Sequence, residues 1–246
     1  MVDNARKIST GSYDLNTWLY GGYEKDVITA VAGVAGCGKT NFCMLAAVSQ
    51  AKKGNKVIFV DSEGGFSVER VKQLAGEDYE KVLENILILS PTSFEEQKRD
   101  FEKLLKLVKS ESEIGLIVVD GMTMLYRLEI GDAAQEKDDD KIKNVNRELA
   151  RQMRALAEIA RKKNIPVIVT NQVYGSFLTD EERRKGVKPE MHMVGGDLLK
   201  YWSKCIIHLE FERGHRRAVL IKHRSLPQKS LGFKITNENI RKAGWI

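Results

Sequence analysis

The sequence predicts an α/β fold in which a mainly parallel central sheet is flanked by helices and ends in a C-terminal antiparallel hairpin. Three observations lead to this prediction. Short apolar runs alternate with stretches of helical spacing, which is typical of a parallel sheet covered by helices. The last two apolar runs lie close together on either side of Gly214, as in a hairpin. Hydrophobic residues make up 42% of the 246 residues, enough for a sizeable core.

The expected strands follow from the apolar runs. In chain order they are Val27–Ala32, Val57–Val60, Ile86–Leu89, Leu116–Val119 and Val167–Thr170, and then the hairpin strands Cys205–Phe211 and Ala218–Lys222. Between the runs, apolar residues recur at intervals of three and four, which predicts helix faces that belong to the core. The two clearest stripes are Phe94, Phe101, Leu104, Leu105 and Val108, and Ile142, Val145, Leu149, Met153, Leu156 and Ile159.

Two charged stretches, Arg127–Lys141 and Tyr174–Gly196, interrupt this pattern, and each follows the end of an expected strand. We expect both to be long loops, which inside a compact domain are commonly functional or disordered. Ligands of open parallel sheets bind at the carboxyl ends of the strands, where these loops would lie. The chain shows no internal repeat and no linker, so we expect one domain over residues 1–246.

Charge and cysteine content bound the function. A net charge of +6 favours anionic partners, although a well-solvated surface rich in Lys and Glu would give the same excess. Cys37, Cys43 and Cys205 form no metal-like cluster, and their odd number argues against a secreted disulfide framework. No apolar run approaches the roughly 20 residues that span a bilayer. We therefore expect a cytoplasmic protein without membrane insertion.

A phosphate-binding loop is predicted directly after the first long strand. The pattern Gly-x-x-x-x-Gly-Lys-[Ser/Thr] is met by Gly33, Val34, Ala35, Gly36, Cys37, Gly38, Lys39 and Thr40, with a strand before it and a helix-compatible run after it. The glycines let backbone N–H groups converge on phosphates, and the helix N-terminus adds its positive dipole. Lys39 can reach the β- and γ-phosphates and Thr40 can ligate Mg²⁺. We expect ATP and Mg²⁺ as cofactors.

Three further residues complete the predicted nucleotide site. Asp120 ends an apolar strand, which is the position of the second metal anchor in phosphate-loop proteins. Glu63 follows another strand and could polarise a water against the γ-phosphate, although a helix-capping or solvated acid is an equal alternative at this point. Gln172 stands in a comparable position and could sense the γ-phosphate.

Several segments resemble the RecA-like recombinases of the archaeal and eukaryotic branch, over nearly the whole chain. The resemblance lies in Ser9–Asn16, in Asp61–Phe66 with Glu69 and Arg70, and in Thr170–Val173. It implies a RecA-like ATPase core in which Glu63 is the catalytic glutamate. Lys39 and Gln172 would assist it.

The resemblance also assigns the rest of the nucleotide site. It implies that Arg70 stacks on adenine and that Ser225–Pro227 caps ATP in a neighbouring subunit, with Pro227 as the contact. Asn41, directly after the phosphate loop, is a further candidate nucleotide-binding residue. By the same resemblance, Arg127–Lys141 and Tyr174–Gly196 are the two loops that face DNA, and Gln172 links ATP to the second of them.

Two departures from that branch shape the expected function. From the sequence we expect a protein without the N-terminal helical DNA-binding domain and without the linker that plugs into the next subunit. The first loop is acidic, with Asp132, Glu136, Asp138, Asp139 and Asp140, and would repel phosphates. The chain therefore most resembles the short archaeal paralogues that assist the main RadA-type recombinase and hydrolyse ATP slowly. An active strand-exchange recombinase and a KaiC-like signalling ATPase without DNA binding are the alternatives.

Two basic clusters are candidate DNA sites. The second loop contains Arg183, Arg184, Lys185 and Lys188, diluted by two glutamates, and the hairpin region contains Arg213, Arg216, Arg217, Lys222, His223 and Arg224. Clustered cations suit phosphates of single-stranded, and also double-stranded or branched, DNA. Two lysines of bacterial RecA with the spacing of Lys222 and Arg224 touch nucleotide across a subunit interface. That role, in a weak homo-oligomer, stays open beside DNA binding.

Overall fold

The structure, a computed structural model, describes residues 6–111, 113–175 and 191–244. Its strands are β1 (Lys7–Ile8), β2 (Tyr23–Glu24), β3 (Ile28–Gly33), β4 (Lys56–Asp61), β5 (Ile86–Leu89), β6 (Ile114–Asp120), β7 (Val167–Gly175), β8 (Met191–Met193), β9 (Ser203–Glu212), β10 (His215–Lys222), β11 (Lys229–Ile235) and β12 (Ile240–Lys242). Its α-helices are α1 (Tyr13–Trp18), α2 (Lys39–Ala51), α3 (Val68–Ala75), α4 (Tyr79–Glu84), α5 (Phe94–Ser110), α6 (Met124–Gln135), α7 (Asp139–Lys163) and α9 (Gly196–Trp202).

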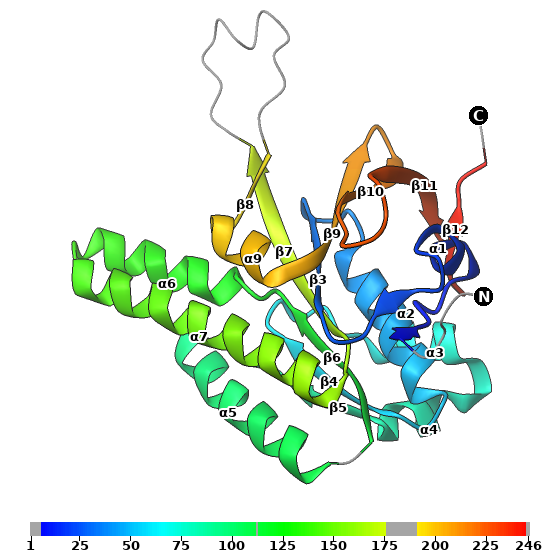
Figure 1. The fold of residues 1–246 in the computed structure, drawn as a ribbon, viewed down its shortest axis with the longest axis horizontal. Coiled ribbons are helices and arrows are strands. Elements are labelled where there is room, and N and C mark those ends of the chain that lie inside the picture. Colours follow the sequence, from blue (N-terminus) through cyan, green and yellow to red (C-terminus); the bar gives the residue numbers. More distant parts are fainter. Residues whose placement is uncertain (1–5, 112, 176–190, 245–246) are drawn as a thin grey trace, which may run out of the picture.

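The centre is one sheet with the strand order β12-β11-β10-β9-β3-β7-β6-β4-β5 (Figure 1). Strands β9, β3, β7, β6, β4 and β5 are parallel, whereas β10, β11 and β12 continue the sheet in antiparallel pairs. The predicted α/β fold with a mainly parallel sheet and an antiparallel C-terminal part is confirmed. Each expected strand is present, with ends shifted by a few residues.

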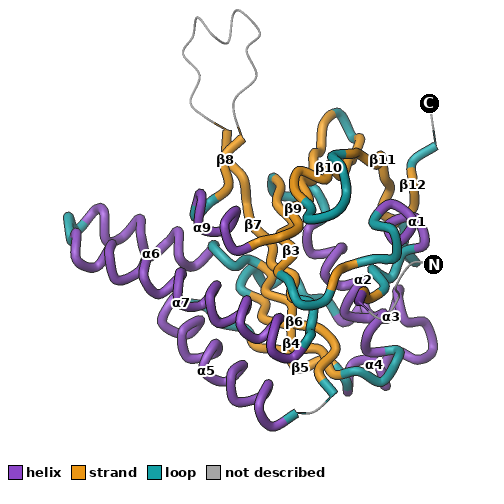
Figure 2. The backbone as a smooth tube through the Cα atoms, in the orientation of Figure 1, coloured by secondary structure: helices purple, strands orange, loops and turns teal. Residues whose placement is uncertain are grey.

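Helices cover both faces of the sheet (Figure 2). On one face, apolar side chains of β4 such as Val57 and Phe59 pack with α2, α3 and α4. On the other face, the alternate side chains Ile58 and Val60 pack with α5 and α7. The two predicted helical stripes lie in α5 and α7 and are largely buried, except that Leu105 is exposed. Alternation along the strands thus builds two cores, one on each side of the sheet.

The prediction that Arg127–Lys141 is a long loop is wrong. The stretch lies in α6 and the start of α7, which form an antiparallel helical pair that projects from the sheet (Figure 1). Its acids begin a helix: Asp138 accepts the N–H of Lys141 at 2.8 Å and caps α7, and Asp139 and Asp140 follow in the first turn. Acidic residues are favoured there because they complement the positive end of the helix dipole.

The other predicted loop, Tyr174–Gly196, is only partly within the described residues. Its flanks extend the sheet, because β7 continues to Gly175 and pairs antiparallel with β8. The residues between them, 176–190, lie outside the described part of the chain, and so do Arg183, Arg184, Lys185 and Lys188. Within the described ranges, the structure contains no helix long and apolar enough to cross a membrane.

Candidate nucleotide site and basic cluster

The phosphate loop joins β3 to α2 and is flanked on one side by strands β9, β10 and β11. Lys39 is the first residue of α2, and its Nζ donates to the backbone oxygens of Gly33 and Val34, both at 3.1 Å. Gly38 has a φ of +112°, and a Cβ there would lie 2.8 Å from Ile235 of β11. This glycine is therefore required both by its backbone conformation and by the close approach of the sheet.

The remaining residues of the loop offer mainly backbone groups to a bound nucleotide. Ala35 and Gly36 are exposed, whereas Cys37 is buried beneath the loop. Burial raises the pKa of the Cys37 thiol, and the charges of Lys39 and Arg216 oppose that rise. Cys37 is a packing residue, and its N–H donates to the backbone oxygen of Val34 at 3.4 Å. Asn41 follows in the first turn of α2 and is half-buried.

Asp120 and Thr40 meet at the side of the loop and fit a divalent cation. Asp120 is fully buried, and its Oδ1 accepts the hydroxyl of Thr170 at 2.6 Å. Its Oδ2 is buried and forms no hydrogen bond with the described residues, although the Thr40 hydroxyl is near enough to lower the pKa of Asp120. A Cβ on Gly65 would lie 3.2 Å from Thr40 Oγ1 and 3.6 Å from Asp120 Oδ2. The missing side chain keeps this corner open.

Burial is the largest influence on Asp120 and raises the pKa of its carboxyl. The hydroxyls of Thr170 and Thr40 lower that pKa, while the nearby charges of Glu63 and Asp61 raise it further. A buried carboxylate among other acids needs a cation to compensate its charge. The donor set of one carboxylate oxygen and one hydroxyl suits Mg²⁺, which keeps several waters and binds phosphates at the same time.

Glu63 is positioned by the turn that follows β4. Asp61 holds this turn because its two carboxylate oxygens accept the N–H groups of Gly65 and Phe66 at 3.0 and 2.9 Å. Gly121, with a φ of +88°, lets the side chain approach, since a Cβ there would lie 2.7 Å from Glu63 Cγ. The alternative that Glu63 caps a helix does not hold for α3, because Ser67 is its cap.

Gln172 joins Glu63 to the segment beyond β7. Its Nε2 donates to Glu63 Oε1 at 3.2 Å, and its backbone oxygen accepts the N–H of Val194 at 3.1 Å. The neighbouring Asn171 is fully buried, donates to Val194 O at 2.7 Å, and accepts the hydroxyl of Thr123 just before α6. One strand end therefore touches the candidate catalytic carboxylate, the segment after β8 and the start of α6.

Two of these positioning residues, Asp61 and Thr170, were not found from the sequence. Thr170 donates to Asp120 and its hydroxyl also accepts the N–H of Gly121 at 2.7 Å. A signal existed, because both are polar residues that end buried strands at the carboxyl edge. The sequence does not show which strands are neighbours in the sheet, however, and the contacts of each residue depend on that strand order.

Arg70, the predicted adenine contact, lies in the first turn of α3. Its Nη1 donates to Gln73 Oε1 and to Asn237 O, both at 2.8 Å. Burial lowers the pKa of its guanidinium. Arg70 thus spans from α3 to the turn between β11 and β12, which is compatible with the predicted adenine contact.

The predicted basic cluster of the hairpin does not form one patch. Strand β10 runs antiparallel to β9 and so begins at the carboxyl edge of the sheet and ends at the amino edge. Its eight residues span roughly 25 Å. Arg216 consequently lies beside the phosphate loop, whereas Lys222 and Arg224 lie at the opposite edge. Residues that are close in sequence are carried to two different surfaces.

Most cations of the cluster have partners within the chain. Arg217 binds Glu210 of the neighbouring strand, with Nη2–Oε2 at 2.6 Å, and Lys222 Nζ donates to Lys200 O at 2.7 Å. Arg224 forms a bidentate pair with Asp26, at 2.7 and 3.1 Å, and a further bond to Glu24 at 2.9 Å. Arg213 stands at the hairpin tip and is exposed. Phosphate binding by the paired residues would have to compete with these contacts.

His223 is a buried structural residue. Its side chain is 2% exposed, and its Nδ1 accepts the N–H groups of Ser225 and Leu226 at 3.1 and 3.2 Å. Burial lowers the pKa of the imidazole, while Glu24, 3.7 Å from Nε2, raises it. The ring therefore holds the segment that carries Pro227, and it is buried, whereas the neighbouring Lys222 and Arg224 are exposed.

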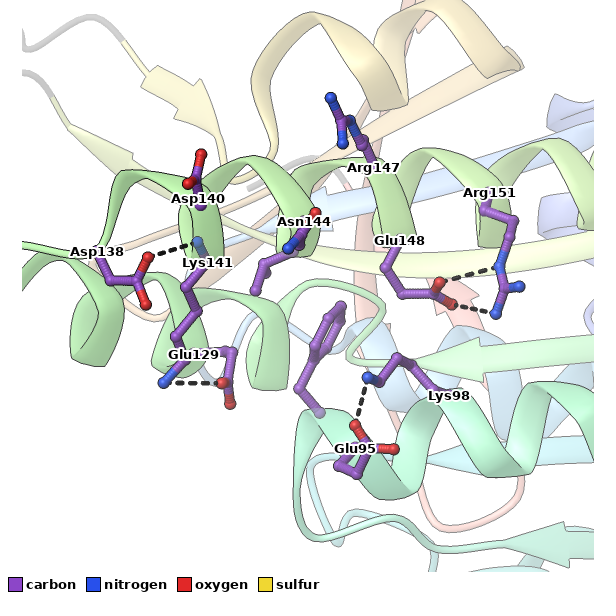
Figure 3. Close-up of a pocket in the computed structure, with 12 residues that line it drawn as sticks. Glu95, Lys98, Glu129, Asp138, Asp140, Lys141, Asn144, Arg147, Glu148 and Arg151 are labelled. Atoms are coloured by element: carbon purple, nitrogen blue, oxygen red, sulfur yellow. Dashed lines mark hydrogen bonds and ion pairs between the residues drawn. The ribbon is translucent and has the colours of Figure 1, made fainter. Parts of the chain in front are cut away.

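A cleft of about 590 Å³ lies between α5, α6 and α7 (Figure 3). Ion pairs within the chain line it, including Lys98–Glu95, Lys141–Glu129 and Arg151–Glu148. These pairs neutralise one another, so the cleft has no strong charge preference. We assign it no part in nucleotide binding.

Comparison with known proteins gives consistent matches over almost the whole chain. The Rad51 family model matches residues 3–243. The DNA repair and recombination protein RadB of Methanobrevibacter smithii is 41% identical over 97% of each chain. The RadB protein of Methanocaldococcus jannaschii is 40% identical over 90% of this chain and 96% of its own. A crystal structure of the RadB recombinase matches with a TM-score of 0.74 and 35% identity, covering 96% of this chain and 99% of that chain.

Proposed function

Because the chain belongs to the Rad51 family, we propose that it is a weak ATPase that binds DNA and acts in homologous recombination and repair. We assign it the role of an accessory or regulator of the main RadA-type recombinase. The observation that carries the ATPase assignment is the convergence of Lys39, Thr40, Asp120 and Glu63 at one edge of the sheet. The recombination role is supported by relatives named as DNA repair and recombination proteins.

In the proposed mechanism, the phosphate loop and the N-terminus of α2 bind the phosphates of ATP. Lys39 exchanges its backbone partners for phosphate oxygens, which carry more charge and form stronger hydrogen bonds. Thr40 and Asp120 Oδ2 would hold Mg²⁺, which when bound neutralises charge on the phosphates. Arg70 stacks on the adenine at the rim of the site.

Hydrolysis is assigned to Glu63, which accepts a proton from the water that attacks the γ-phosphate. Gln172 orients the carboxylate through its bond to Oε1. The same strand end contacts Val194, so a change at the γ-phosphate moves the segment that flanks residues 176–190. This connection would couple nucleotide state to DNA binding.

The DNA-binding assignment covers the basic residues at 183–188 and, in the hairpin region, Arg213, Arg217, Lys222 and Arg224. Lys222 and Arg224 support a second role in a weak homo-oligomer, because they lie at the sheet edge opposite their own phosphate loop. A nucleotide that they contact would therefore belong to another copy of the chain. Pro227, in the segment held by His223, lies at the same edge.

The nucleotide assignment is tested with fluorescent ATP and the variant Lys39→Ala. Removing a charged phosphate contact should weaken binding by roughly 100-fold while the unfolding temperature stays unchanged. Lys52→Ala, at the other end of α2, is the matched control and should bind ATP normally. Unchanged ATP affinity in Lys39→Ala would remove the phosphate-loop assignment.

The DNA assignment is tested by anisotropy of labelled single-stranded DNA without nucleotide, with ADP and with ATP, across a salt series. We expect salt-sensitive binding that shifts with the nucleotide. Absence of binding even at low salt would show that the DNA part is wrong.

The accessory role is tested in strand-exchange assays with and without the main recombinase. We expect no exchange by this protein alone and a changed rate when it is added to the recombinase. Efficient exchange without the recombinase would instead identify it as an active strand-exchange enzyme.

A further inference from the structure

Arg216 has an environment that differs from the rest of the basic cluster. We propose that Arg216 is a positioning residue of the nucleotide site, which acts on the phosphate loop of its own chain from β10. The inference rests on the nucleotide binding proposed above. It replaces the expectation that Arg216 contacts DNA.

The sheet register brings Arg216 to the loop. Gly33, which starts the phosphate loop, pairs with Leu209 of β9, and Leu209 pairs with Ala218 of β10. Arg216 stands two residues from Ala218, towards the carboxyl edge, and on the same side of the strand. That side carries the fully buried Ala218 and Leu220, so Arg216 continues a face that packs inward against α2 and the loop.

Its contacts hold the guanidinium in place. Arg216 lies over the ring of its cross-strand partner Phe211, with Cζ 4.4 Å from the ring centroid. Its Nη2 donates to the backbone oxygen of Gly36 at 3.4 Å. Its Nε is buried and forms no hydrogen bond with the described residues. Stacking of the guanidinium on an aromatic ring fixes a side chain that is otherwise flexible.

This arrangement affects the loop in two ways. The bond to Gly36 O restrains the peptide between Gly36 and Cys37 and, because the peptide is planar, also the Cys37 N–H, which donates to Val34 O at 3.4 Å. The guanidinium also adds a positive charge next to that of Lys39, and both charges act on the Cys37 thiol. A residue that supplies charge at this place should matter more as the number of phosphates on the ligand rises.

Arg217 provides a matched control. It is the adjacent residue, has the same chemistry, and points to the other side of β10, where it pairs with Glu210 at 2.6 Å. If Arg216 served DNA as part of a general basic surface, the two residues would behave alike. If Arg216 serves the phosphate loop, only its substitution affects nucleotide binding.

The test is the affinity of wild-type protein, Arg216→Gln, Arg216→Lys and Arg217→Gln for fluorescent ATP and ADP and for adenosine, measured by competition. We expect Arg216→Gln to weaken ATP and ADP binding roughly tenfold, since a charge-assisted contact is lost, and to leave adenosine binding unchanged. Arg216→Lys should recover part of the loss, because it restores the charge but not the planar stack. Arg217→Gln should stay within about twofold of wild type.

Thermal unfolding without nucleotide checks that each variant is folded, and Arg216→Lys carries the test if Arg216→Gln is not. ATP binding by folded Arg216 variants that equals wild type would overturn the proposal. An equal loss in the Arg216 and Arg217 variants, or an equal loss for adenosine and ATP, would also overturn it. Failure of the wild-type protein itself to bind ATP would refute the underlying function, a result distinct from failure of the inference alone.

Discussion

The nucleotide edge and the basic cluster at Arg213–Arg224 are both conspicuous in the sequence, but folding treats them in opposite ways. At the nucleotide edge, residues that are distant in the chain converge: Thr170 reaches Asp120 at 2.6 Å, and Gln172 reaches Glu63 at 3.2 Å. In the basic cluster, neighbours separate to two edges of the sheet. Parallel strands gather their carboxyl ends, whereas one antiparallel strand carries adjacent residues from one edge to the other.

Among the substitutions considered, the largest effect on activity should follow from replacing Glu63 at the nucleotide edge. Glu63→Gln removes the proton acceptor and should reduce kcat for ATP hydrolysis roughly 100-fold or more, because general-base catalysis contributes that much. ATP affinity should change little, since the phosphate loop is intact. Steady-state phosphate release and ATP binding measure the two quantities. A variant with normal turnover would show that another group activates the water.

A smaller effect is expected when the metal corner is narrowed. Gly65→Ala places a methyl group 3.2 Å from Thr40 Oγ1, and the gain in ATP affinity on adding Mg²⁺ should fall roughly tenfold as the ligands are displaced. Gly131→Ala in α6 is the control, because a Cβ there meets nothing within 4 Å. Titrations of ATP with and without Mg²⁺ give the comparison. An equal gain in both variants would place the cation elsewhere.

The role of the basic cluster at Arg213–Arg224 is tested by the salt dependence of DNA binding. If Arg213 and Arg217 contact phosphates of single-stranded DNA, reversing both to Glu should reduce the slope of log affinity against log salt by about 1.4, or about 0.7 per contact. ATP affinity should stay the same because neither side chain has a described contact with the phosphate loop, and Arg217 pairs with Glu210. Reversal of Lys162 at the end of α7 is the control. An unchanged slope would move the DNA site to other cations.

The smallest effect concerns pH and His223. Burial lowers the pKa of this imidazole in the folded protein below its unfolded value of about 6.5. Between its lower folded-state pKa and about 6.5, this histidine binds more protons in the unfolded chain than in the folded one. The free energy of unfolding should therefore fall as the pH drops below about 6.5. His223→Gln should reduce this pH dependence, and His215→Gln, at an exposed position, should not. Urea unfolding between pH 7 and 5 measures both, and equal pH dependence in all three proteins would contradict the assignment.

The parts of the site that were predictable lie in contiguous motifs. Gly33–Thr40, Asp120 and Glu63 each follow a recognisable apolar strand, so their edge of the sheet could be inferred from the chain alone. The role of Thr170 could not, because its contact with Asp120 depends on β6 and β7 being neighbours. The place of Arg216 depends on the register of three strands.

The acidic stretch before α7 was misread for a different reason. Asp138 and its neighbours have the composition of a loop, and the same residues are favoured in the first turn of a helix. Composition alone does not distinguish the two. Packing of α6 against α7 decides the outcome, and only the folded chain contains that information.

The hydrogen bond between Thr170 and Asp120 affects how the site would bind and release Mg²⁺. It occupies one carboxylate oxygen and leaves a single one for a cation, and the described residues contain no group of three or more His, Cys, Asp or Glu side chains that could hold a metal. Such a corner retains an ion only with help from a ligand's phosphates. The cation would then bind together with each nucleotide and dissociate with it. The concentration of free magnesium in the cell, and not a permanently bound ion, would determine how much of the protein carries Mg²⁺ and nucleotide together.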